Sequence, residues 1–559
     1  MNHALQSLQD ISVPALVFFL SLILSLVFTP VADRMARILG IIDQPCERKI
    51  HKECVSRLGG VAMAIPLFLA VMVFAPANLE LAGFLAGAGV IFAAGFIDDK
   101  RGLSPKIKFL FQILAVVSFI AISGIYLTNL GNILGFGPLM LGMAGPVLTV
   151  IAMTGVINSL NLSDGLDGLA AGMAGIACLF FIPFAFDQGN QVYLIILISL
   201  LGVILGFLRF NTHPARLFMG DSGSLLLGFV MAASAVALTQ VEALGRGYLP
   251  VTALIIVSLP VADTLYVMTR RILKGKSPVQ PDKTHIHHRL MEIGFSHQLT
   301  VSGIYCFMLG MGVMAWIIRP MPEWFQFYLT LGIYIFLYSL IFLAEQKTVK
   351  KNKRVGFNLL MSPSGKIPEK ALIWAAGKSR IFFVFFWLLF MAAALFTPDL
   401  SVEFRYYLLF VMVFGLFFYP FRGGIKQMGI AHGVIFFGLY SLVLAQNVAF
   451  EGNKWFYAFM FALSALALIW TAARVVNTRR IRVLWPGSFE ILLLGMAMVM
   501  PIILHYSVFF GYDFRFKMWM SFLQVVPFLL LNKVYMRRNP VRIRKFAGFI
   551  MAVFVILLI

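Results

Sequence analysis

The long apolar runs constrain this chain more than any other feature. A helix needs ~20 residues to cross a bilayer, and eighteen runs come close to that length. With 60% hydrophobic and only 12% charged residues, the chain buries these runs in lipid, which excludes a soluble protein. The sequence therefore predicts an all-α polytopic membrane protein, with eleven helices followed by seven. The predicted runs lie near 12–32, 59–76, 80–97, 107–126, 138–157, 169–186, 191–208, 223–241, 248–268, 299–318 and 324–344, and then near 381–397, 404–420, 428–448, 455–473, 487–505, 516–532 and 546–559.

The positions of lysine and arginine indicate how the runs are oriented. When the segments between the runs are assigned alternately to two sides, all but six of the 45 Lys and Arg residues fall on one side. Under the positive-inside rule that side is cytoplasmic, so both termini are expected outside. The net charge of +21 then indicates contact with anionic membrane lipids and no role in nucleic-acid binding.

A basic tract divides the chain. The sequence predicts a first membrane module at 1–345, a basic cytoplasmic linker at 346–380 and a second membrane module at 381–559. The cytoplasmic loops of the second module contain no Asp or Glu, so a divalent metal site is expected only in the first.

Four polar clusters stand at the ends of apolar runs, and the orientation places all four on the cytoplasmic side. Ionisable groups at membrane depth are costly and mark functional sites. The clusters are Asp98–Arg101, Asn158–Gly168, Phe218–Ser224 and His285–Arg289.

The spacing of the second cluster predicts a surface of oxygen ligands. Asp164 and Asp167 are three residues apart, and Asn161 and Asn158 continue the same face if the segment is helical. Carboxylate and amide oxygens suit Mg²⁺ or Mn²⁺ and not zinc. The alternative is that Ser163 or Asp164 only caps the next helix.

The third and fourth clusters indicate phosphate chemistry. Gly220 and Ser222 stand where a helix begins, which favours a bound diphosphate, and Asp221 between them suits a metal bridging to that phosphate. Three histidines within His285–Arg289 follow a basic loop and are expected to contact phosphate and base, although lipid headgroups are an alternative partner. Asp263 is expected to pair with Arg270 or Arg271.

Together these motifs resemble those of the polyprenyl-phosphate N-acetylhexosamine-1-phosphate transferase family. The resemblance covers residues ~1–345 and implies a bundle of ten or eleven helices with the site in cytoplasmic loops. It implies transfer of a sugar 1-phosphate from a UDP-sugar to undecaprenyl phosphate, with release of UMP and with Mg²⁺ or Mn²⁺ as cofactor. The motifs that carry it are Asp98–Asp99, Gly102–Phe109, Asn158–Gly168, Phe218–Ser224 and His285–Arg289.

The resemblance also implies roles for individual residues. Asp98, Asp99 and Asp167 resemble the catalytic carboxylates, and Asp221 and Asp164 resemble the metal ligands. Direct attack by the lipid phosphate is expected. The residues expected to contact substrate are Arg48, Lys49, His51, Lys106, Lys108, Asn158, Asn161, Gly220, Ser222, Arg270, Arg271, His285, His287, His288 and Arg289.

The histidine motif is similar to that of the branch taking UDP-N-acetylhexosamines such as UDP-N-acetylglucosamine. Its products start cell-surface glycans, among them O-antigen lipopolysaccharide and cell-wall polymers, at the bacterial inner membrane. Ser56 departs from the family, which usually has proline before the following arginine.

Three readings stay open at this stage. A phospho-N-acetylmuramoyl-pentapeptide transferase is the nearest alternative, and a secondary transporter is disfavoured because the acids gather at one surface without an internal repeat. The sequence leaves the sugar, the role of 381–559 and the assembly state, including a homodimer, undecided.

Overall fold

The computed structural model describes residues 2–43, 55–240, 250–275, 277 and 284–351. The chain divides into two compact units, 1–361 and 362–559, and every element described below belongs to the first. The predicted substrate contacts Arg48, Lys49 and His51 lie outside the described residues, as do the seven predicted runs beyond residue 380.

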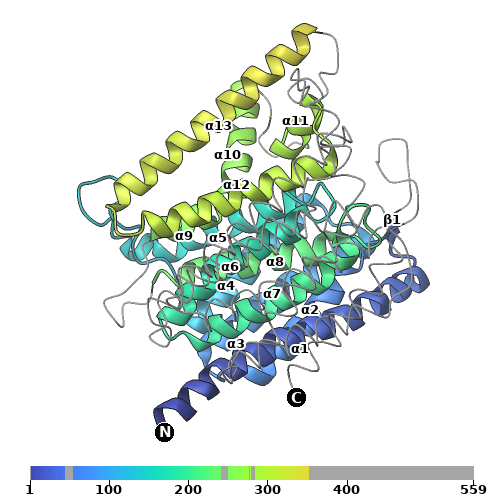
Figure 1. Cartoon of the computed structure of the whole chain (residues 1–559), viewed down its shortest axis with the longest axis vertical. Coiled ribbons are helices and arrows are strands. Elements are labelled where there is room, and N and C mark those ends of the chain that lie inside the picture. Colours follow the sequence, from blue (N-terminus) through green and yellow to red (C-terminus); the bar gives the residue numbers. More distant parts are fainter. Residues whose placement is uncertain (1, 44–54, 241–249, 276, 278–283, 352–559) are drawn as a thin grey trace, which may run out of the picture. The chain divides into compact units, whose positions relative to one another are not determined.

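The first unit is a helical bundle with one two-stranded sheet in its described part (Figure 1). Its elements are α1 (Asn2–Leu39), β1 (Ile42–Asp43), β2 (Val55–Ser56), α2 (Gly59–Phe74), α3 (Leu79–Arg101), α4 (Pro105–Ser123), the 3-10 helix η1 (Gly142–Ala144), α5 (Gly145–Leu162), α6 (Leu169–Asp187), α7 (Gln191–Asn211), α8 (Gly220–Ala237), α9 (Pro250–Ile256), α10 (Ser258–Leu273), α11 (Ile286–Ile293), α12 (His297–Ile317) and α13 (Glu323–Lys351).

Within the described residues, nine helices are long and apolar enough to cross a membrane. Helices α9 and α10 make a tenth span if they count as one, although they are bent by 79°. Helix α2 is apolar but has only 16 residues. Each of the eleven predicted runs before residue 345 thus corresponds to an apolar helical element, which confirms the all-α polytopic fold.

The bend between α9 and α10 has a local cause. Pro260 has no N–H to donate to the carbonyl of Ile256, so one bond of the α-helical ladder is missing at the break. The Ser258 hydroxyl donates to the Ile255 carbonyl at 2.6 Å across the break. The interruption lets α10 leave the direction of α9 and reach α11 (Figure 1).

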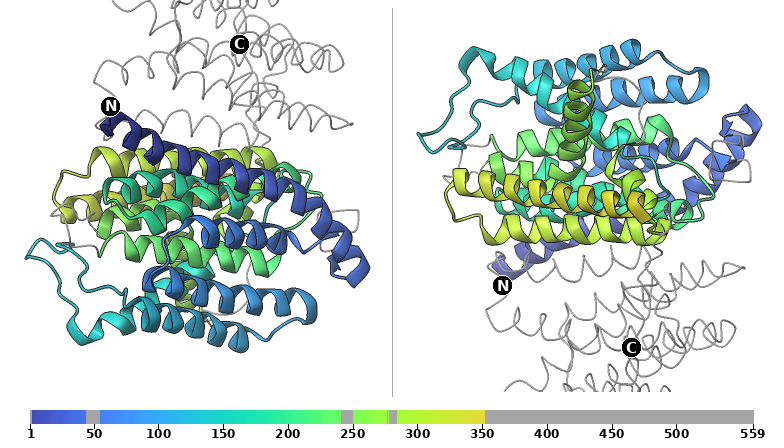
Figure 2. Two further views of the ribbon diagram at one scale, coloured as in Figure 1. Left: turned by 90° about the horizontal axis from the view of Figure 1, so that it is seen from below. Right: turned by 90° about the horizontal axis from the view of Figure 1, so that it is seen from above.

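Helices α6, α7 and α8 form the most buried part of the bundle. Helix α6 is apolar around its whole circumference, which is typical of a helix surrounded by others. Helix α7 packs on α1 and α2, while α8 packs on α3 and α5. Figure 2 shows α3 and α4 side by side along one edge of this bundle.

Small residues bring the outer helices close to α8. A Cβ added at Gly95 of α3 would lie 2.5 Å from the Ser222 Cα, and one at Gly228 of α8 would lie 2.7 Å from the Ile157 Cα. Without side chains at these points the backbones approach closely, as in other membrane bundles. The end of α3 and the end of α5 therefore lie beside the start of α8.

A short turn joins α3 to α4. Gly102 has a φ of 69°, which favours glycine, and the Ser104 side chain caps α4 by accepting from the Ile107 N–H. Pro105 occupies the first turn of α4, where its missing N–H costs nothing. The turn directs the first residues of α4 back toward the acidic end of α3.

The two-stranded sheet and the start of α2 are attached to the segment before α8. The Phe218 N–H donates to the Ser56 carbonyl at 2.8 Å, and the Gly60 N–H donates to the Met219 carbonyl at 2.7 Å. Ser56 is buried and pairs through its backbone with Leu217. Ser56 is therefore accommodated in a bridged strand, at the position where the resemblance led us to expect proline.

Candidate active site

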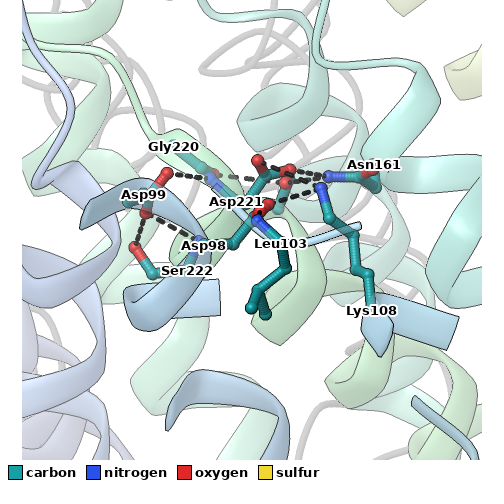
Figure 3. A network of polar contacts seen from close by, with 9 residues as sticks. Asp98, Asp99, Leu103, Lys108, Asn161, Gly220, Asp221 and Ser222 are labelled. Carbon is teal, nitrogen blue, oxygen red and sulfur yellow. Dashed lines mark hydrogen bonds and ion pairs between the residues drawn. The ribbon is translucent and has the colours of Figure 1, made fainter. Parts of the chain in front are cut away.

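Asp99 holds the start of α8. Its Oδ1 accepts from the Asp221 N–H at 2.8 Å, and its Oδ2 accepts from the Ser222 N–H and hydroxyl at 3.0 and 2.6 Å (Figure 3). A carboxylate at a helix N-terminus satisfies otherwise unpaired N–H groups and opposes the helix dipole. Gly220 has a φ of 70°, and a Cβ there would lie 2.6 Å from Asp99 Oδ2. The structure thus gives Asp99 and Gly220 a positioning role, and their predicted catalytic and substrate-binding roles stay predictions.

Asp98, unlike Asp99, contacts the α3–α4 turn and the first turn of α4. Its Oδ1 accepts from the Leu103 N–H at 2.5 Å, and its Oδ2 lies 2.5 Å from Lys108 Nζ. The same ammonium lies 3.3 Å from Asp221 Oδ2 (Figure 3). Lys108 thereby bridges the end of α3 and the start of α8.

Asn161 completes this cluster from α5. Its Nδ2 donates to Asp221 Oδ1 at 2.6 Å and to the Ser224 hydroxyl at 2.8 Å. Four helices, α3, α4, α5 and α8, therefore contribute to one network of carboxylates, amide and ammonium.

The prediction of a single oxygen-bearing helical face over Asn158–Asp167 is wrong. Helix α5 ends at Leu162, and Asp164 and Asp167 lie in the turn before α6. Glycine is a poor helix former, and Gly165 and Gly168 favour this interruption. The alternative of a cap at Ser163 or Asp164 is also wrong, because α6 begins after Gly168 without a side-chain cap.

Asp164 stays with the acidic network. Burial and then the nearby charges of Asp221, Asp99 and Asp167 raise the pKa of Asp164 to about 7. Burial is the larger cause, and the three carboxylates add negative charge that a bound divalent cation would offset.

Asp167 turns toward a different set of partners. Its Oδ2 lies 2.7 Å from His213 Nδ1 and accepts from the Ala215 N–H at 3.0 Å, while its own N–H donates to His297 Nε2 at 3.1 Å. Burial alone would raise the pKa of Asp167, but these hydrogen bonds and the nearby imidazoles lower it. Asp167 is therefore held ionised.

His213 and His297 were missed by sequence reasoning. Their rings stack with centroids 4.1 Å apart, and their nitrogens and an Asp167 oxygen all lie within 4.8 Å of one another. Neither histidine stands inside a recognised motif, and they are separated by 84 positions. The one available signal was the position of His213, shortly before Phe218.

The histidine cluster lies partly on α11, against the turn that carries Asp164. A Cβ added at Gly165 would lie 2.3 Å from His287 Nε2. Burial, together with the charges of His288, His285 and His297, lowers the pKa of His287 to about 3, so its imidazole is neutral at pH 7. A side chain at position 165 would require the His287 imidazole to move.

Asp263 anchors the start of α11, and the prediction that it pairs with Arg270 or Arg271 is wrong. Its carboxylate lies 2.8 Å from His285 Nδ1, accepts from the Ile286 N–H at 2.9 Å and accepts from the Tyr338 hydroxyl at 3.1 Å. The bend at Pro260 explains this, because it directs α10 toward α11.

Arg289 anchors the same helix to α13. Its Nε and Nη2 donate to the two Glu345 oxygens at 2.5 and 3.0 Å, and its guanidinium lies 4.9 Å from the Tyr266 ring centroid. Burial would lower the pKa of Arg289, and the bond to Glu345 raises it. His285 and Arg289 thus bind protein carboxylates, and their predicted substrate contacts stay predictions.

The structure brings most of the predicted site residues together and leaves others apart. Lys106 is exposed on α4, and Arg270 and Arg271 lie at the far end of α10 from its bend. Asn158 lies almost one turn before Asn161 on α5. The predicted residues that lie in contact or within reach of one another's charges are Asp98, Asp99, Lys108, Asn161, Asp164, Asp167, Gly220, Asp221, Ser222, His285, His287 and His288.

The donor set fits a divalent cation that prefers oxygen ligands. Asp98 and Asp221 share Lys108 as a partner, and Asp164 is close enough to Asp221 for their charges to interact. Mg²⁺ and Mn²⁺ take such ligands. That Asp221 and Asp164 would hold such an ion stays a prediction.

Fold and site together define a multi-pass membrane protein with a carboxylate-rich centre at the ends of its helices. Residues 81–239 match the model of glycosyl transferase family 4. The chain is 34% identical over 322 residues to a probable undecaprenyl-phosphate N-acetylglucosaminyl 1-phosphate transferase of Bacillus subtilis, covering 57% of this chain and 89% of that protein.

Two further relatives have names of the same class of transferase. The undecaprenyl-phosphate α-N-acetylglucosaminyl 1-phosphate transferase of Escherichia coli is 30% identical over 368 residues, covering 64% of this chain and 98% of the relative. The decaprenyl-phosphate N-acetylglucosaminephosphotransferase of Mycolicibacterium smegmatis is 36% identical over 303 residues, covering 49% and 74%. The chain belongs to the polyprenyl-phosphate N-acetylhexosamine-1-phosphate transferase family, and it is a transferase.

Proposed function

We propose that this protein transfers N-acetylglucosamine 1-phosphate from UDP-N-acetylglucosamine to undecaprenyl phosphate. An oxygen of the lipid phosphate attacks the sugar-bearing phosphorus of the donor and forms the new P–O–P bond. The bond from that phosphorus to the bridging oxygen breaks, and UMP leaves with the oxygen. The product, undecaprenyl-diphospho-N-acetylglucosamine, would start a cell-surface glycan.

One observation carries the proposal: Asp98, Lys108 and Asp221 meet at the ends of three helices, with Asp164 beside them. Phosphoryl transfer depends on positioning and on neutralising charge more than on covalent chemistry by the protein. The names of the relatives supply the sugar and the class of lipid.

The residues divide the work by position. Asp98 orients the lipid phosphate, with Lys108 beside it to offset the incoming negative charge. Asp221 and Asp164 hold Mg²⁺, which when bound neutralises the donor diphosphate as a Lewis acid. His287, which is neutral, lies against Gly165, the residue after Asp164. Asp167 and Asn161 position the nucleotide-sugar.

The charge asymmetry of the sequence supports a topology for this reaction. With 39 of the 45 Lys and Arg residues on one side of the predicted spans, that side faces the cytoplasm, where nucleotide-sugars are made. The proposal therefore places the site on the cytoplasmic side of the bacterial inner membrane, with the N-terminus outside.

A panel of radiolabelled UDP-sugars, assayed with undecaprenyl phosphate in membranes of expressing cells, tests the proposal. UDP-N-acetylglucosamine should give labelled lipid and an equal amount of UMP. Labelled lipid from UDP-N-acetylmuramoyl-pentapeptide, with none from the N-acetylhexosamines, would move the protein to the alternative branch.

A pair of variants links the activity to the site. Asp221→Asn should lower turnover by at least about 100-fold, because outer partners of a metal site alone account for 10- to 100-fold effects. Asp33→Asn removes an acid of α1 that pairs with Arg37 and should leave turnover unchanged. Near-normal turnover in Asp221→Asn would refute its metal role.

A further inference from the structure

We propose that Lys108 competes with the divalent cation for Asp221. Its ammonium pairs with Asp221 until the cation takes that place and the donor diphosphate becomes the new partner of the ammonium. This inference rests on the proposed metal role of Asp221 and adds a residue that regulates how that metal binds.

Lys108 has two carboxylate partners at different distances. Its Nζ lies 2.5 Å from Asp98 Oδ2 and 3.3 Å from Asp221 Oδ2 (Figure 3). The other Asp221 oxygen, Oδ1, already accepts from Asn161 at 2.6 Å. Oδ2 is therefore the Asp221 atom that the ammonium and a metal ion would share.

Burial makes this contest stronger than it would be at a surface. The Lys108 side chain is 21% exposed and that of Asp221 is 33% exposed, so both charges are partly buried. Partly buried charges are screened less by salt than exposed ones. An ammonium that close to a metal ligand repels an incoming cation and lowers the affinity of the ligand for it.

Lys108 can withdraw from Asp221 without losing all its partners. Asp98 is the closer of its two carboxylates, so a small movement leaves the Lys108–Asp98 ion pair intact. The released side of the ammonium then faces the phosphates of the donor, whose negative charge offsets the cation. Cation and nucleotide-sugar are therefore expected to bind cooperatively, each favouring the arrangement that the other needs.

Manganese binding to the full-length protein in detergent tests this directly, without any measurement of turnover. Free Mn²⁺ is followed by electron paramagnetic resonance during titration of the wild type, Lys108→Met and Lys106→Met. Lys108→Met should bind Mn²⁺ on the order of tenfold more tightly, since a cation within about 4–6 Å shifts the proton affinity of a carboxylate by one to three pKa units.

Lys106→Met is the matched control. It removes the same charge from the same turn of α4, but Lys106 is exposed. Its effect on Mn²⁺ affinity should stay within about twofold because solvent and salt screen it. Lys108→Gln is a second variant with the same expected result as Lys108→Met, and size-exclusion chromatography checks that both fold.

Each result decides something different. Mn²⁺ affinity that is unchanged or weaker in the folded Lys108 variants would overturn the competitor role while leaving the metal site in place. A wild type that binds no Mn²⁺ would instead refute the metal role of Asp221 on which the inference stands. In the wild type, UDP-N-acetylglucosamine should tighten Mn²⁺ binding more than it does in Lys108→Met.

Discussion

Asp98 and Asp99 are adjacent in the sequence, yet their carboxylates serve different helices. Successive residues of a helix point about 100° apart, so Asp99 reaches the N-terminus of α8 while Asp98 meets α4. Both oxygens of Asp99 accept hydrogen bonds from backbone and hydroxyl donors, whereas Asp98 contacts a lysine side chain that can move. The doublet therefore combines a fixed support with a carboxylate open to chemistry.

The raised pKa of Asp164 predicts a pH dependence of metal binding. Below its pKa of about 7 the group carries a proton, which a metal ion must displace. Apparent Mn²⁺ affinity should therefore fall as pH drops from 8 to 5, approaching about tenfold per unit below pH 7 for one displaced proton. Isothermal titration calorimetry over this range measures the profile.

Two variants separate Asp164 from its neighbour in that experiment. Asp164→Asn should flatten the profile around pH 7. Asp167→Asn should keep it, because the pKa of Asp167 is lowered and this group stays ionised over the range. A profile that survives in Asp164→Asn would assign the proton to another group.

At the scale of elements, the approach of α3 to α8 is what brings the acids together. Gly95→Ala places a Cβ 2.5 Å from the Ser222 Cα, which belongs to the backbone and cannot rotate away. The helices must separate, so we expect a loss of about 1–3 kcal/mol of stability, typical of overpacking, and a large loss of turnover. Thermal unfolding in detergent and the transferase assay measure the two effects.

Gly89 on the same helix supplies the control. A Cβ there meets nothing within 4 Å, so Gly89→Ala should be neutral or stabilise by about 0.5–1 kcal/mol. If both glycine variants behaved alike, helix propensity and not the contact between α3 and α8 would explain the result.

The position of α11 also depends on two carboxylates. Asp263 accepts a hydrogen bond from the first residue of α11, and Glu345 pairs with Arg289. Glu345→Gln replaces a charged hydrogen bond by a neutral one beside a side chain that is 1% exposed. We expect a loss of about 1.5–3 kcal/mol, together with a higher KM for the nucleotide-sugar because α11 also carries His287.

Glu292→Gln tests whether this loss is specific. Glu292 is exposed on α11 and its removal should change stability by less than about 0.5 kcal/mol. An unchanged KM in Glu345→Gln would show that α11 keeps its position without this ion pair.

At the scale of the whole molecule, the boundary between the two units predicts where the chain tolerates truncation. Unit 1 ends at Met361, beyond the end of α13 at Lys351 and beyond Glu345. A chain ending after Met361 should therefore fold and keep transferase activity, measured as UMP release in membranes.

A shorter chain gives the comparison. Ending the protein after Pro322 removes α13 and with it the partner of Arg289, so activity should fall sharply. A 1–361 chain that folds but releases no UMP would show that the second unit takes part in catalysis.

The sequence by itself determined the membrane fold, the order of the apolar helices and the residues from which a site is built. Run length, hydropathy and the Lys/Arg asymmetry are local quantities that add along the chain, so no tertiary contact was needed to read them. The same local reasoning failed at Asp164 and Asp167, where a helical spacing was assumed across a turn.

Only the tertiary structure decided which side chains meet. That Lys108 joins Asp98 to Asp221, that Asp263 binds His285 and not a nearby arginine, and that His213 and His297 flank Asp167 depend on how closely helices approach. Those distances depend on where small residues face a neighbouring helix and on the break at Pro260. The spacing of residues along the sequence does not specify them.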